Sequence, residues 1–112
     1  MVNQSILGSM KQMLYGSGAV LADSYDQELV VLINGYLAIL RQLGVGPAEG
    51  LYITGEDETW SQLTDNQQDV AMAKSYIYMK LRIDFDPPDN ASVLSAYKEN
   101  VKEIEWRAEV GA

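Results

Sequence analysis

Four stretches of this 112-residue chain repeat apolar side chains at the 3.6-residue period of an α-helix, with glycine or proline breaks between them. The period predicts helices over residues 4–15, 26–43, 66–84 and 90–109. The second is apolar around more than half of its circumference, which indicates a helix at the centre of the core. The Asp-Pro-Pro-Asp turn at 86–89 should fold the last two helices into an antiparallel hairpin. We therefore expect an all-α fold, a small four-helix bundle.

Capping residues mark the expected helix ends. Ser24 or Asp26 can accept the unpaired N–H groups that begin the second helix, and Asp65 or Asn66 those of the third. Gly44 is expected to end the second helix.

Residues 44–65 form a long connection between the second and third helices. Residues 51–54 are a short β-prone run, and residues 59–63 are a possible second one. The connection is thus either a long central loop or a short β-hairpin across residues 55–57. Loops of this length in a small domain are usually functional.

Composition limits the chemistry of the chain. It has 47% apolar residues, enough for one modest core, so residues 1–112 are read as a single domain. It has no cysteine and no histidine, which excludes disulfides, thiolate zinc sites and imidazole-based catalysis. We expect no enzyme activity, no catalytic residue, no cofactor and no bound metal.

The charge of the chain is strongly acidic, with 16 acids against 8 bases and a net charge of −8. Most of the acidic excess lies in residues 23–73, whereas residues 74–112 are nearly balanced. This sign argues against binding to phosphate backbones or to anionic membranes. No apolar run approaches the roughly 20 residues of a membrane span, and the N-terminus does not resemble a signal peptide. The expected setting is the cytosol, with protein partners.

Two acidic clusters admit a functional and an ordinary interpretation. Carboxylates within 84–89 could bind Mg²⁺ or Ca²⁺, but a helix end followed by a helix cap explains them more simply. Carboxylates at 56–58 are either a solvated turn or a contact for a basic partner.

Seven tyrosines, two tryptophans and five methionines are many for a chain of this length. Such residues are enriched at protein interfaces, and not all of them fit into one small core. Three are therefore candidates for a subunit contact: Trp60, Tyr78 and Trp106.

Two motifs near the C-terminus, Phe85-Asp86-Pro87-Pro88 and Glu105-Trp106-Arg107, resemble the head–tail connector (head-completion adaptor) proteins of long-tailed bacteriophages. Ile33-Asn34, the segment 43–50 and Thr59-Trp60 match the same pattern in the same order, so the resemblance extends over residues 4–109.

The resemblance implies a non-catalytic virion protein of the neck, assembled in the host cytoplasm into a ring of about a dozen subunits. Its implied partners are the portal protein and a tail-side stopper or tail-completion protein, with duplex DNA passing through the ring unbound. An acidic wall suits such a channel because it repels phosphates. Candidate subunit or partner contacts are Trp60, Tyr78, Trp106, Arg107, Glu56, Asp57 and Glu58.

Two other functions stay open from the residues alone. The acidic clusters would also suit a small binding module, an antitoxin or DNA mimic, that neutralises a basic partner. A carboxylate metal enzyme is the third alternative.

Overall fold

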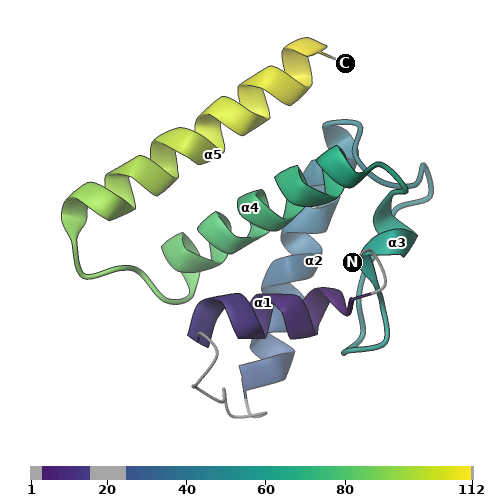
Figure 1. Ribbon diagram of the computed structural model, residues 1–112, viewed down its shortest axis with the longest axis horizontal. Helices are drawn as coiled ribbons and strands as arrows, with labels where there is room; N and C mark the ends of the chain where they lie inside the picture. Colours follow the sequence, from purple (N-terminus) through teal and green to yellow (C-terminus); the bar gives the residue numbers. More distant parts are fainter. Residues whose placement is uncertain (1–3, 16–24, 112) are drawn as a thin grey trace.

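The computed structural model describes residues 4–15 and 25–111, and within them it has five helices and no strand (Figure 1). The helices are α1 (Ile6–Tyr15), α2 (Asp26–Gln42), α3 (Trp60–Leu63), α4 (Gln67–Asp84) and α5 (Ala91–Gly111). The all-α prediction is confirmed, and the four long helices begin and end within two residues of the expected positions. The expected number of four helices is corrected to five, because a further helix of one turn, α3, is present.

Helix α4 is the centre of the packing, because it contacts α1 and α2 on one side and α5 on the other. Figure 1 shows α5 lying along α4 and running in the opposite direction, as the double-proline turn predicted. Helix α5 thus forms an outer edge of the molecule, on the side of α4 away from α1 and α2.

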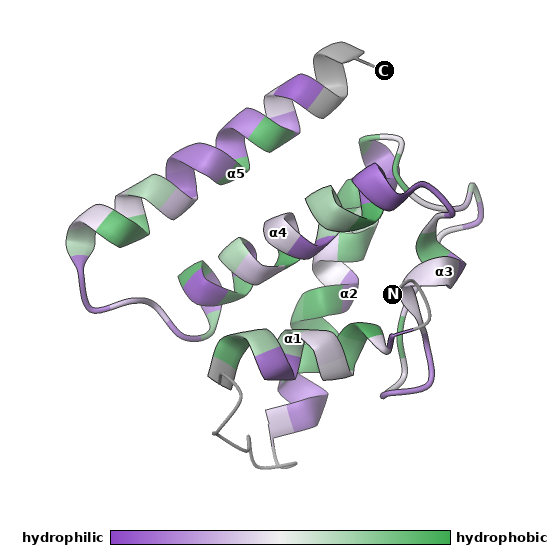
Figure 2. Cartoon of the chain, viewed as in Figure 1, coloured by the Kyte–Doolittle hydropathy of each residue, from purple (hydrophilic) through white to green (hydrophobic). Residues whose placement is uncertain are grey.

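The hydrophobic core lies between α1, α2, α3 and α4 and is extended by Val101 of α5. Figure 2 shows the apolar residues concentrated on the first helices and α4, whereas α5 is mostly hydrophilic with a few apolar positions. Twelve core side chains are large and almost fully enclosed: Trp60, Tyr76, Ile6, Leu7, Met10, Leu29, Ile33, Leu37, Leu40, Ile53, Ile77 and Leu81. Among the described helices, none combines the length and apolarity needed to cross a bilayer.

The long connection is not a hairpin. The strand-like contact of this region is a single antiparallel bridge between Ser5 and Thr59, with Trp60 N donating to Gln4 O at 3.1 Å. Residues 60–63, which were a possible second strand, form helix α3 instead. The reason is local, since Thr59 and Gln62 form a reciprocal capping box that satisfies the first N–H groups of a helix.

The expected helix caps are confirmed only in part. Asn66 caps α4, accepting hydrogen bonds from Gln68 N and Asp69 N. Gly44, with φ of +91°, follows α2 in the left-handed region that favours glycine. At the start of α2, Ser24 lies outside the described residues. Asp26 is the first residue of that helix and forms an ion pair with Lys11.

Candidate interaction surfaces

Trp60, predicted as a contact residue, lies in the core with none of its side chain exposed. Its Nε1 donates to Ser9 Oγ of α1 at 3.1 Å, and Lys74 Nζ lies 5.6 Å from the centre of its ring. A buried indole usually finds such a partner for its N–H. Trp60 therefore fixes α3 against α1 and is not part of the surface of the single chain.

Tyr78 is half-buried between α4 and α5. Its ring meets Tyr97 of α5 edge-to-face, with centroids 6.2 Å apart, and its hydroxyl accepts a hydrogen bond from Arg82 Nη1 at 3.1 Å. Both the ring and the hydroxyl of Tyr78 therefore already have partners within its own chain. Whether it also meets a partner stays a prediction.

Trp106 projects from α5 with 63% of its side chain exposed. Lys98 and Lys102 precede it at intervals of four residues, so all three lie along one side of the helix, and both lysines are exposed. We call these three residues the α5 strip. Within the described residues, neither lysine has an ion-pair partner.

Arg107 lies on a different side of α5 and forms an exposed ion pair of 2.7 Å with Glu103, one turn earlier. This is the i,i+4 pair that the sequence favours. Ion pairs between exposed groups contribute little to stability. Arg107 stays available to a partner, and its role in contacts is still a prediction.

The acidic residues 56–58 lie in a tight turn. Glu58 accepts hydrogen bonds from Thr54 N at 2.9 Å and Thr54 Oγ1 at 2.8 Å, and so closes the turn. The bond from the Thr54 N–H holds the pKa of Glu58 below its ordinary value. Glu56 and Asp57 remain exposed at the tip. One of the three predicted acids is therefore structural, and the other two face solvent.

A shallow groove of about 300 Å³ lies between the first turns of α2 and this turn. We call it the α2 groove; its lining residues are Asp26, Gln27, Val30, Val31, Thr54 and Gly55. Val31 is 70% exposed, and Tyr52, two residues before the groove-lining Thr54, is 71% exposed. The groove is therefore a mixed polar and apolar surface beside an acidic turn, with Val31 as its exposed apolar side chain.

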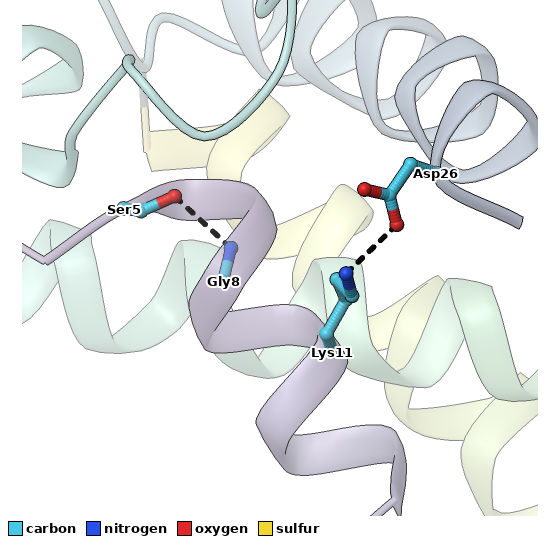
Figure 3. Close-up of polar contacts among 4 residues, drawn as sticks. All are labelled: Ser5, Gly8, Lys11 and Asp26. Carbon is cyan, nitrogen blue, oxygen red and sulfur yellow. Dashed lines mark hydrogen bonds and ion pairs between the residues drawn. The ribbon is translucent and has the colours of Figure 1, made fainter. Parts of the chain in front are cut away.

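The α2 groove is anchored to α1 by an ion pair. Lys11 Nζ lies 2.8 Å from Asp26 Oδ1, and Figure 3 shows Lys11 reaching from α1 to the first turn of α2. Figure 3 also shows Ser5 Oγ accepting a hydrogen bond from Gly8 N at the start of α1. The ion pair ties α1 to the first turn of α2, which lines the groove, and the Ser5 bond caps the start of α1.

In the cluster at 84–89, Asp84 has a structural partner, and a helix cap follows the cluster. Asp84 accepts a hydrogen bond of 2.7 Å from the Tyr36 hydroxyl, and Asn90 caps α5 through bonds from Ser92 N and Val93 N. In the described part of the chain, no three potential ligand residues converge as a metal site would require.

Sequence reasoning did not identify Val31 or Tyr52. Val31 adjoins the half-buried Leu32, and Tyr52 adjoins the buried Ile53. Only the direction of each side chain, away from the core, could have distinguished them.

The family model of the phage connector proteins matches residues 6–112, nearly the whole chain. The chain therefore belongs to the phage connector protein family, whose role in joining head and tail is structural and not catalytic. No curated protein and no solved structure matches it.

Proposed function

We propose that the chain is one head–tail connector domain, residues 1–112, that forms a ring on the portal of the filled capsid. The ring joins the head to a tail-side stopper or tail-completion protein and lines the channel through which DNA leaves. Family membership over residues 6–112 is the observation that carries this proposal. The ring would contain about a dozen copies, as the resemblance implies.

The surface of the chain supports a self-assembling role. Apolar side chains are exposed on two separate elements, Val31 of α2 and Trp106 of α5, and aromatic residues such as Trp106 are enriched at protein interfaces. A ring formed from one kind of subunit needs two different contact surfaces, one on each side of each copy.

The charge supports a channel that does not hold DNA. With a net charge of −8, the chain repels phosphate backbones, and a duplex can slide past without the cost of releasing many ionic contacts. The same charge makes copies repel each other, so the contacts between subunits must offset it.

Native mass spectrometry and negative-stain imaging test the proposal, with the protein alone and mixed with its portal. We expect ring-sized assemblies, either free or only on the portal surface. Particles made without the protein should lose their genome or fail to acquire tails. A chain that stays monomeric and ignores the portal would contradict the proposal, and so would tailed, filled particles that lack it.

A further inference from the structure

The two surfaces that expose Trp106 and Val31 lie on opposite sides of the molecule. The α5 strip is on the helix that forms one edge, and the α2 groove is at the beginning of α2 near the turn 54–57 (Figure 1). Because the two surfaces are far from each other within one chain, they can meet only between copies.

The two surfaces also have opposite charges. The α5 strip has two exposed ammonium groups, Lys98 and Lys102, without carboxylate partners in the described residues. Next to the α2 groove, Glu56 and Asp57 are exposed carboxylates that likewise form no ion pair among the described residues. Each surface thus offers the charge that the other lacks, beside an exposed apolar side chain.

We propose that the α5 strip of one copy docks into the α2 groove of the next, with Trp106 against Val31 and Tyr52. Lys98 and Lys102 then face Glu56 and Asp57 of that neighbour. This inference rests on the proposed ring and names the two surfaces that close it. The occupant of the groove is a second copy of this chain.

The charges favour this head-to-tail contact over a symmetric one. If two α5 strips met each other, their lysines would face lysines, and two grooves meeting would bring acids together. When two copies bind head to tail, one keeps a free strip and the other keeps a free groove, so the contact continues from subunit to subunit until a ring closes.

Mixing two variants tests the contact. Trp106→Ala removes the aromatic side chain from the strip, and Val31→Lys places a like charge in the groove. Each variant alone should need about 30-fold more protein to assemble than the wild type, as expected when a central aromatic contact is lost. Mixed in equal amounts, the two should form heterodimers and no ring, because only one intact strip and one intact groove can meet.

Introduced cysteines locate the contact directly, since the chain has none of its own. A short bis-maleimide should link a Lys102→Cys chain to an Asp57→Cys chain in the mixture. It should not link either variant to itself. The pair Glu56→Lys and Asp57→Lys should abolish assembly, and so should the pair Lys98→Glu and Lys102→Glu. A chain with all four changes should assemble again.

Val93→Ala serves as the matched control, because it shortens another exposed apolar side chain of α5 on a different side from the strip. Its assembly and the far-ultraviolet circular dichroism of all variants should equal those of the wild type. The variant sites are exposed, so their folding should be unaffected.

Three results would overturn the inference while the proposed ring stands. The first is a wild type that forms rings while Trp106→Ala and Val31→Lys assemble equally well. The second is a Lys102→Cys chain that links mainly to itself, which would indicate a symmetric contact. The third is a Trp106→Ala chain that keeps its ring but loses the portal, which would assign the strip to the portal. A wild type that assembles neither alone nor on the portal overturns the proposed function, and this inference with it.

Discussion

At the residue scale, Asn34 gives one loop residue the two backbone hydrogen bonds that a neighbouring strand would give it in a sheet. Its side chain bonds both backbone groups of Ile53, accepting from the N–H at 2.6 Å and donating to the carbonyl oxygen at 3.0 Å. Ile53 is 1% exposed, so its backbone has little access to water as an alternative partner. One amide on α2 therefore holds the loop that carries Tyr52 and the acidic turn.

We expect Asn34→Ala to lower the free energy of unfolding by about 2–4 kcal/mol, because two buried backbone groups lose their partner together. Urea denaturation followed by circular dichroism measures this. Gln42→Ala, at an exposed position of the same helix, is the control and should change little. A loss below about 0.5 kcal/mol for Asn34→Ala would show that water replaces the amide at Ile53.

At the scale of elements, two tyrosine hydroxyls join α4 to its neighbours through carboxylates. Tyr76 of α4 donates to Glu105 Oε2 of α5 at 2.7 Å, and Tyr36 of α2 donates to Asp84 Oδ2 at the end of α4 at 2.7 Å. Burial, and then the adjacent carboxylate, raise the pKa of both tyrosines well above the ordinary value. The bonds therefore require the neutral phenol.

These raised pKa values predict a loss of stability in alkali. The unfolded chain releases its tyrosine protons near pH ~10, whereas the folded chain retains them, so the free energy of unfolding falls as the pH rises above about 10. Below that pH the contribution of the two bonds is fully present. Urea denaturation at about pH 8 and about pH 11 measures the difference.

Tyr76→Phe should lower the free energy of unfolding by about 1 kcal/mol at pH ~8 and reduce the further loss in alkali, because one of the retained protons is gone. Tyr52→Phe removes an exposed hydroxyl and is the matched control, with no change expected at either pH. An alkaline loss in Tyr76→Phe as large as in the wild type would contradict the role of this bond.

At the scale of the whole molecule, α5 is attached by one side only. Val101 is its one buried side chain among residues 91–107, whereas α2 has five and α4 has six. Few buried contacts make local opening easier. Among the four long helices, the longest therefore has the fewest buried side chains in the described residues.

Hydrogen–deuterium exchange should show this difference. We expect the amides of α5 in the monomer to exchange faster than those of α2 and α4, after correction for intrinsic rates. In the ring, exchange between residues 98 and 106 should slow, because the strip is then covered. Equal protection of α5 and α2 in the monomer would contradict the weak attachment.

Much of the helical layout is local and could be predicted. The apolar period placed the long helices, and residues such as Asn66 and Gly44 act within a few positions of themselves. Exposure could not be predicted in the same way. Trp106 is exposed and Trp60 is buried in the single chain, while the exposed Val31 and Tyr52 were not identified. The predicted partner contacts stay predictions.

The sequence by itself determined which segments are helical, where they stop, and that the chain is acidic and lacks the residues of most catalytic sites. Only the tertiary structure decided which aromatic side chains face water. Trp60 is enclosed by the apolar core, and Ser9, 51 positions away, accepts its N–H. Asn34, 19 positions from Ile53, satisfies the backbone of Ile53 in the loop. Such partners come together only on folding, so no local pattern in the chain contains them.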